Sequence, residues 1–512
     1  MRRFPRQATG QQRVQFAPEL DIPSPVGGLN TRDNLGDMPI TDALELVNWL
    51  PSNQSVKARE GYTVQADDLT GETESLLVYK NGTVSKMIAA VGGGWEEVPS
   101  IAGDPSSTVV AASTFTNDRW QSINVGGFLF AVNGADAPRH WDGTTVTTPT
   151  FTGDITTPTA ATMDGIHLYK NRVYLWDTDD SDFYYGATNA ISGAFTKFQL
   201  GQISKTGGNL MCVKTLSFDA GDGLDDVIVF FLDTGETLIY TGSDPASDLA
   251  IVGTYYLPPP LSVRSAVEFA GDIRILTEAD TISMLDYLRG EGKEQRLSKL
   301  AGAVKSEVSL YKSLFGWESI WFNAGDLLIY NVPNIADDTY VQYVTNTSTG
   351  ASTKLEGYNA RCFAVWDNEL YFGDTNAVYK AFDGQTDNGS NINLTAQQAY
   401  STLGIQGEKR LIAYELLIGS EGALTINLGV GYNYAQVNVT SAGTSTAAGT
   451  LWDAATSLWD VAPWSGGNDV RISRFGLRGS GLAVSVKFTV SVQNQTPEWY
   501  RSTYVYEQMV AR

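Results

Sequence analysis

Short hydrophobic runs separated by polar turns fill the chain from about residue 75 to residue 385. The runs are four to seven residues long and rich in β-branched and aromatic side chains, which is typical of strands. Most end at a tight-turn signal such as Asn81-Gly82 or Asp383-Gly384. The pattern predicts strands at residues 76–79, 86–91, 128–132, 172–176, 227–231, 237–240, 272–276, 327–330 and 369–372.

A loose repeat in this region indicates a β-propeller. Two hydrophobic strands around a polar turn recur at residues 169–175, 231–240 and 365–374. A propeller blade takes roughly 40–50 residues. Residues 76–388 are therefore predicted to form an irregular propeller of about six to eight blades.

The pattern differs on both sides of the predicted propeller. Residues 1–25 carry four arginines and no periodicity, so they are predicted to be an N-terminal arm, either a frayed end or a partner-binding segment. Alternating strands resume after residue 389. We expect residues 389–512 to form a β-sandwich or platform domain together with residues 26–75, which gives an all-β fold with two parts.

One short helix is predicted within the platform segment, between Pro39 and Pro51. Thr41 or Asp42 can cap it, and Glu45 stands at capping-box spacing from Asp42. Pro51 would end it.

Charge limits the range of functions. The 512 residues carry a formal net charge of −22, and a surface this acidic repels DNA, so specific DNA binding is not expected. No apolar stretch approaches the roughly 20 residues that span a bilayer, and no apolar segment of a signal peptide follows the basic start. We expect assembly in a reducing cytoplasm and no autonomous membrane insertion.

The sequence offers little for catalysis, so we expect no enzyme activity, no catalytic residues and no cofactor. Its only histidines are His140 and His167, and its two cysteines, Cys212 and Cys362, form no metal-ligand cluster. Two acidic loops are weak candidates for cation binding, although solvated turns are the preferred interpretation, and neither matches an EF-hand. Their residues are Asp177, Asp179, Asp222 and Asp225. Three tryptophans suit a sugar platform or, preferably, interior packing: Trp452, Trp459 and Trp464.

The most specific motif lies in residues 26–62 and reads Val26-Gly27-Gly28-Leu29-Asn30-Thr31-Arg32-Asp33, then Asn48-Trp49-Leu50-Pro51 and Arg59-Glu60-Gly61-Tyr62. It resembles the opening of the tail-nozzle proteins of short-tailed bacteriophages, also called tail tubular protein B or tail hub proteins. Residues 127–134 with 138–143, and residues 476–485 with 499–501, resemble later segments of the same family. The resemblance implies structural roles for Gly27, Gly28, Asn30, Asp33, Asn48, Pro51, Arg59 and Gly61.

The same resemblance implies a structural subunit of the virion tail. Such nozzles are homohexameric rings below the portal and the head-to-tail adaptor ring. They carry tail fibres or spikes and, in some phages, a tip plug or needle. The genome is retained above the nozzle and leaves through its lumen without specific binding.

Two other function classes compete with the nozzle. A receptor- or glycan-binding propeller protein of the tail should show regular aromatic-bearing repeats, but the repeats here are irregular. A polysaccharide-cleaving enzyme needs a defined carboxylate pair, and none stands out among 57 acidic residues. The nozzle remains the favoured prediction, with the binding propeller as the alternative.

Overall fold

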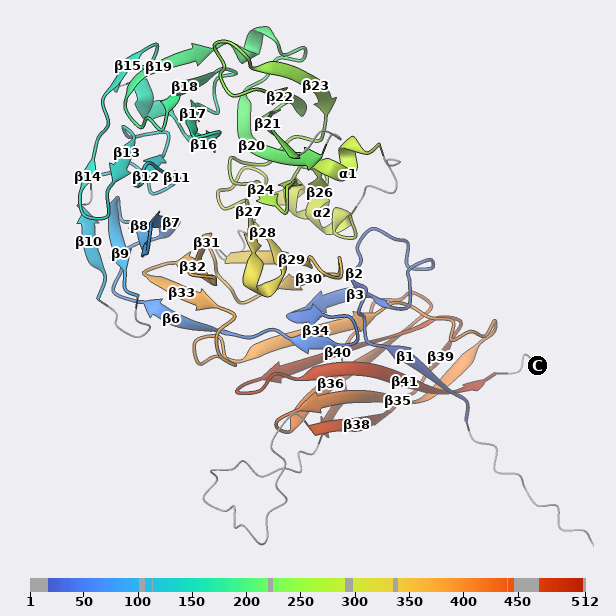
Figure 1. The fold of residues 1–512 in the computed structure, drawn as a ribbon. Coiled ribbons are helices and arrows are strands. Elements are labelled where there is room, and N and C mark those ends of the chain that lie inside the picture. Colours follow the sequence, from blue (N-terminus) through green and yellow to red (C-terminus); the bar gives the residue numbers. More distant parts are fainter. Residues whose placement is uncertain are drawn as a thin grey trace, which may run out of the picture.

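Strands dominate the computed structural model, which describes residues 17–100, 106–112, 114–157, 159–219, 224–290, 298–334, 339–439, 441–445 and 469–509. Figure 1 shows two parts, a ring of small sheets and a stack of longer strands beside it. We call them the propeller and the platform. The predicted all-β fold class is confirmed, and all nine strands predicted in the propeller region lie within observed strands. Most of the arm, and all of Trp452, Trp459 and Trp464, lie outside the described residues.

Six small sheets form the propeller blades. The first two contain β7 (Thr73–Asn81), β8 (Val84–Val91), β9 (Gly94–Val98) and β10 (Thr108–Ala111), then β11 (Gln121–Val125), β12 (Phe128–Val132), β13 (Arg139–Trp141) and β14 (Val146–Thr147). The third and fourth contain β15 (Phe151–Gly153), β16 (Gly165–Tyr169), β17 (Arg172–Trp176), β18 (Phe183–Thr188) and β19 (Gly193–Phe198), then β20 (Leu210–Asp219), β21 (Leu224–Leu232), β22 (Glu236–Thr241) and β23 (Ala250–Tyr256). The fifth contains β24 (Ala266–Phe269), β25 (Asp272–Leu276) and β26 (Thr281–Ser283).

The sixth blade joins the two ends of the propeller. It contains β31 (Cys362–Trp366), β32 (Glu369–Asp374) and β33 (Ala377–Ala381), and its fourth strand is β6 (Tyr62–Ala66) from the N-terminal segment. Strand β6 pairs antiparallel with β33, with Tyr62 opposite Ala381. The ring is therefore held closed by backbone hydrogen bonds between residues about 300 positions apart, a long-range pairing typical of closed β-architectures.

Four strands of a larger sheet stand between the fifth and sixth blades: β27 (Glu318–Phe322), β28 (Leu327–Asn334), β29 (Thr339–Asn346) and β30 (Ser352–Leu355). Strand β27 contacts β24 of the fifth blade on one side and β31 of the sixth on the other. The same sheet continues into the platform, with the order β27-β28-β29-β30-β2-β3-β34-β40-β36-β37. One continuous hydrogen-bonded sheet thus belongs to both parts, and we call it the shared sheet.

The platform is a β-sandwich of the shared sheet and a second, seven-stranded sheet. Its strands from the N-terminal segment are β1 (Glu19–Pro23), β2 (Gly28–Leu29), β3 (Asp42–Val47), β4 (Trp49–Pro51) and β5 (Val56–Ala58). Those from the C-terminal region are β34 (Ile392–Gln398), β35 (Lys409–Ser420), β36 (Leu424–Tyr432), β37 (Ser441–Ser445), β38 (Asp469–Gly476), β39 (Ser480–Gly481), β40 (Val484–Val492) and β41 (Glu498–Gln508). The predicted combination of these two regions is confirmed.

Helices are few in the described part of the chain. They are α1 (Met284–Leu288) and α2 (Ala301–Tyr311), with short 3₁₀ turns at η1 (Thr159–Thr162), η2 (Leu200–Gln202) and η3 (Asn323–Gly325). Helix α2 follows the fifth blade and buries Val304 and Val308 in the platform core. None of the helices in the described residues is long and apolar enough to cross a membrane.

The short helix predicted between Pro39 and Pro51 is wrong, because these residues form β3 and β4. Strand β3 lies inside the shared sheet between β2 and β34, so its backbone is paired on both sides and tertiary pairing overrides the local helix signals. The expected cap, Asp42, instead accepts side-chain hydrogen bonds from Asn30 and Lys299. Asn48, at φ 62°, interrupts the extended backbone and so separates β3 from β4.

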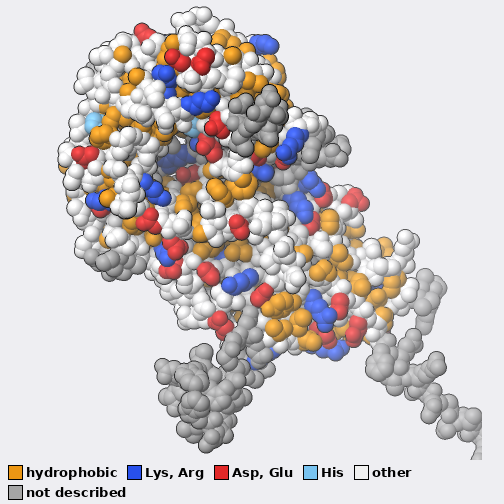
Figure 2. Space-filling view, in the orientation of Figure 1, with side chains coloured by type: hydrophobic (Ala, Val, Ile, Leu, Met, Phe, Trp, Pro, Cys, Tyr) orange, Lys and Arg blue, Asp and Glu red, His pale blue; other side chains and the backbone are white. Residues whose placement is uncertain are grey.

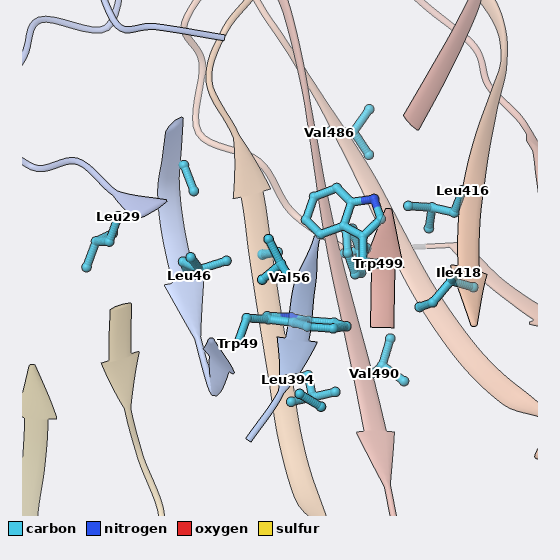
Figure 3. Packing of buried hydrophobic residues seen from close by; sticks show 14 of the residues in the cluster. Leu29, Leu46, Trp49, Val56, Leu394, Leu416, Ile418, Val486, Val490 and Trp499 are labelled. Carbon is cyan, nitrogen blue, oxygen red and sulfur yellow. The ribbon is translucent and has the colours of Figure 1, made fainter. Parts of the chain in front are cut away.

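Three aromatic rings pack together inside the platform core. Trp49 lies 6.1 Å from Phe488 and 6.2 Å from Trp499, and Phe488 lies 4.8 Å from Trp499, all edge to face. Figure 3 shows Trp49 and Trp499 between aliphatic side chains of both sheets. The rings come from β4, β40 and β41, so this cluster binds the N-terminal segment to the C-terminal strands.

Replacing Phe488 with alanine should lower the free energy of unfolding by about 3–5 kcal/mol, because it removes the completely buried ring between two tryptophans. Urea unfolding followed by circular dichroism measures the loss. Leu482→Ala is the control, since Leu482 is 57% exposed, and it should change stability by no more than about 0.5 kcal/mol. Equal losses in the two variants would contradict this packing.

Glu236 fastens the loop that connects the third and fourth blades. Its carboxylate accepts hydrogen bonds from the backbone of Lys205 and Thr206, at 3.0 and 2.8 Å, and from the hydroxyls of Ser204 and Thr206, both at 2.7 Å. Burial alone would raise the pKa of Glu236, but these hydrogen bonds outweigh it and lower the pKa to about 2.

Glu236→Gln should therefore destabilise the protein at neutral pH and not at very low pH. A depressed folded-state pKa contributes stability above the unfolded value near 4.5, and that contribution disappears as the pH falls towards about 2. Melting temperatures of the natural protein and the variant, measured from pH 7 to pH 2, should converge at the acidic end. A difference in melting temperature that is independent of pH would contradict the role of the ionised carboxylate.

Candidate functional site

Arg59 forms the centre of the junction between the platform and the propeller, directly after β5 and before β6. It is completely buried, and its Nη1 and Nη2 donate to the two carboxylate oxygens of Asp387 at 2.7 and 2.6 Å. Nε donates to Oδ1 of Asn48 at 2.9 Å. The remaining two donors reach the carbonyl oxygens of Glu60, at 3.0 Å, and Glu356, at 2.8 Å. All five donors of the guanidinium are satisfied.

Tyr358 covers one face of this guanidinium. The Arg59 Cζ atom lies 4.3 Å from the centre of the tyrosine ring, a cation–π distance. Burial alone would lower the pKa of Arg59, but Tyr358 and Asp387 outweigh it and raise the pKa, so the group stays charged. Burial raises the pKa of Tyr358 itself to about 12, and its hydroxyl lies 2.9 Å from the carbonyl oxygen of Glu60.

Asn48 extends the network into the shared sheet. Its Nδ2 donates to the carbonyl oxygen of Asn393 at 2.7 Å, and its Oδ1 accepts from the backbone of Glu356 at 2.9 Å. Gly61 allows the backbone to approach closely on the propeller side, because a Cβ there would lie 1.8 Å from the carbonyl oxygen of Thr386. Together these contacts fix strand β6 against the platform.

A second cluster surrounds Asp42, which is 1% exposed. Its carboxylate accepts from Lys299 Nζ at 2.9 Å and from Asn30 Nδ2 at 2.8 Å. Lys299 also donates to the carbonyl oxygen of Gly27 at 2.9 Å, and Asn30 also donates to Asp33 at 2.8 Å. Because Lys299 lies two residues before the first residue of helix α2, this cluster attaches the first platform strands to the segment that leaves the fifth blade.

The residues that the resemblance singles out fall mainly into these two clusters. Gly28, at φ 81°, belongs with the Asp42 cluster, because a Cβ there would lie 2.5 Å from backbone atoms of Ser352 in β30. Pro51 stands apart, at the end of β4, where it pairs with Val56. Both clusters are networks of hydrogen bonds and ion pairs that hold segments distant in the sequence together.

The sequence pattern missed Asp387, Tyr358 and Lys299. The Arg59–Asp387 pair joins residues 328 positions apart, and no local spacing reports such a contact. One general rule applies: a buried arginine needs a buried partner. That rule requires an acidic residue and does not say which of 57 it is.

The weak cation candidates do not form a metal centre among the described residues, where no group of three or more potential ligands is found. Asp177 and Asp179 lie in the turn after β17, where Asp177 Oδ1 accepts from the backbone of Asp179 at 2.9 Å. Asp222 lies outside the described residues, and of Asp225 only its place in β21 is described. His167 is buried beside Thr215, and burial lowers its pKa to about 3.

The middle of the propeller is hollowed, with charged side chains on its walls (Figure 2). Two cavities, of about 240 and 220 Å³, share Arg119, Leu314 and Phe315 in their walls. The Phe315 ring stands 4.2 Å from the guanidinium carbon of Arg119 and 5.3 Å from that of Arg264. The segment that follows α2 thus places an aromatic ring in the wall that the two cavities share.

No family model matches the chain, and no curated protein matches it. A chain in the crystal structure of the mitotic checkpoint complex is 10% identical, with 63% of this chain and 94% of that chain covered and a TM-score of 0.36. The structure of BBS1N in complex with ARL6DN, soaked with lead, gives 7% identity, coverage of 64% and 98%, and a TM-score of 0.38. A putative 6-phosphogluconolactonase from Bacteroides uniformis is 12% identical, with 63% of this chain and 91% of that chain covered and a TM-score of 0.34. These likenesses do not identify a function, and the propeller is assigned from its own sheets.

Replacing Arg59 with methionine should cost about 3–5 kcal/mol of unfolding free energy, because it leaves the Asp387 carboxylate buried without its partner. The double variant Arg59→Met with Asp387→Leu should lose less, since no unpaired charge remains. Denaturant unfolding measures both variants.

Arg501→Met is the matched control, because Arg501 and Asp21 form an exposed pair that should be worth less than about 1 kcal/mol. If Arg59→Met costs no more than Arg501→Met, the junction does not depend on this ion pair.

Proposed function

We propose that this chain is a structural, non-enzymatic subunit of the tail nozzle of a short-tailed bacteriophage. The observation that carries the proposal is the position of the residues that the resemblance singles out. All of them except Pro51 lie in the Arg59 and Asp42 clusters, which fasten the platform to the propeller. A motif that is shared for architecture and not for chemistry should be placed in this way.

A ring subunit needs a fixed angle between its parts, because an error in one subunit is repeated around the ring and prevents closure. The shared sheet and the two buried clusters supply such a fixed angle. In this proposal six copies assemble beneath the head-to-tail adaptor ring in the host cytoplasm and carry fibres, spikes or a tip plug in the virion tail.

The negative charge suits a wall that DNA passes without binding. The chain carries a net charge of −22, and like charge opposes adhesion of the phosphate backbone. Figure 2 shows acidic and basic side chains mixed on one face, without a broad basic patch that would hold a duplex.

The alternative is a receptor- or glycan-binding propeller protein of the tail. The cavity of about 240 Å³ favours it, because Phe315 and Tyr340 line it together with Arg119, Arg361 and Glu72. Aromatic faces beside paired charges can hold a polar ligand such as a sugar. The two hypotheses therefore differ in the role of this cavity, which only the alternative uses to bind a ligand.

Mass photometry and electron microscopy of the purified chain, with and without its head-to-tail adaptor ring, test the proposal. We expect six copies bound to one adaptor ring, and no binding to the adaptor ring of an unrelated phage. A monomer in isolation is compatible with assembly on a template. A chain that binds glycans and stays monomeric beside its own adaptor ring would replace the nozzle with the alternative.

A further inference from the structure

Exposed apolar side chains line the end of the platform at which β41 finishes, where Figure 1 marks the C-terminus. They come from four separate segments of the chain, and we call them the apolar strip. Exposed apolar side chains that lie together, unlike single ones, indicate a contact surface. The strip consists of Met509, which is 46% exposed, Leu482 (57%), Tyr434 (45%) and Leu35 (37%).

The first half of the strip joins the end of β41 to the segment after β39. The backbone of Met509 donates to the carbonyl oxygen of Glu408 at 2.9 Å. The hydroxyl of Ser480 donates to the Glu408 carboxylate at 2.6 Å, and Leu482 lies two residues further along the chain. Met509 and Leu482 therefore belong to segments that are bonded to the same residue.

The second half continues to the loop between β2 and β3. The backbone of Leu482 donates to Oδ1 of Asn433 at 2.7 Å, and Tyr434 is the next residue. A Cβ on Gly36 would lie 3.6 Å from the Tyr434 hydroxyl, and Leu35 precedes Gly36. The four segments are thus neighbours in one row, with Met509 at one end and Leu35 at the other.

The N-terminal arm leaves the platform at the Met509 end of this row. Strand β1 pairs antiparallel with β41, and Glu19 lies opposite Val505. The same register, continued by three residues, places residue 16 opposite Gln508, which precedes Met509. Residues 1–16 lie outside the described part of the chain, so the register fixes where they begin.

The composition of residues 1–16 suits an apolar strip on an acidic body. They carry four arginines and no acidic residue, so the net charge of −22 less the +4 of this segment leaves −26 for residues 17–512. Opposite net charges of this size attract each other over long distances. The segment also supplies apolar side chains at Phe4, Val14 and Phe16. Sixteen extended residues reach at most roughly 50 Å, against a spacing of about 4.8 Å between neighbouring strands.

We propose that residues 1–16 dock along the apolar strip of their own chain. Phe16 and Val14 lie against the Met509 end, and attraction between the arginines and the acidic body holds the rest of the segment close. The docking does not depend on the proposed nozzle, because every residue that it uses belongs to one chain.

Hydrogen exchange of the full-length protein, read by mass spectrometry, tests the docking against a synthetic peptide of residues 1–16. The amides of residues 11–16 should exchange about tenfold more slowly in the protein than in the peptide, and equally slowly at low and high protein concentration. Denaturant unfolding is not the readout, because a docked terminus detaches locally before the sheets unfold.

Two results of this comparison would overturn the proposal. Exchange at the rate of the free peptide would mean that the segment does not dock. Protection that increases with protein concentration would mean that the strip receives a second copy of the chain instead of its own residues 1–16.

A pair of substitutions locates the docking on the strip. Leu482→Asn combined with Tyr434→Asn should return residues 11–16 to the exchange rate of the free peptide, because two apolar contacts are lost. Asparagine also tolerates the φ of 66° at Tyr434. Circular dichroism confirms that the variant is folded.

The matched control is Val109→Asn combined with Ile251→Asn, which removes two exposed apolar side chains from outer strands of the propeller. It should leave the exchange of residues 11–16 as it is in the natural protein. Equal protection in the strip variant and the natural protein, or the same loss in both variants, would place the docking elsewhere and overturn the proposal.

Discussion

The buried pair of Arg59 and Asp387 is the contact on which the arrangement of the two parts depends. A buried charge is tolerated only when its partner and its hydrogen bonds are all in place. Arg59 meets that condition by drawing Asn48, Glu356 and Asp387 to one point. Segments more than 300 residues apart must therefore be in register before the junction can form.

Backbone pairing in the sheets imposes the same constraint as the Arg59–Asp387 pair, because strands distant in the sequence must align before they can bond. Strand β6 closes the sixth blade, while the shared sheet enters the ring between the fifth and sixth blades. The chain thus enters and leaves the propeller beside the platform (Figure 1). A large relative rotation of the two parts would break continuous ladders of hydrogen bonds, so the molecule is built as one rigid unit.

Local pattern predicted the strands well and the helix badly. Residues 86–91 and 272–276 are short hydrophobic runs, and their sheets are made with neighbours along the chain. Residues 42–47 carry helix signals, yet their partners are β2, β30 and β34, which no nearby residue reveals. The residues of the candidate site were likewise predicted only in part. The motif supplied Asn48, Arg59 and Gly61, but not Asp387 or Tyr358.

The sequence by itself determined that the protein is all-β, with a propeller-like middle and a second domain made from both ends, because strand length, alternation and turn residues act over a few positions. Only the tertiary structure decided the ring closure by β6, the sheet shared by both parts and the partner of Arg59. Each of these depends on contacts between residues distant along the chain, and the energy of such contacts is set by packing and burial in three dimensions.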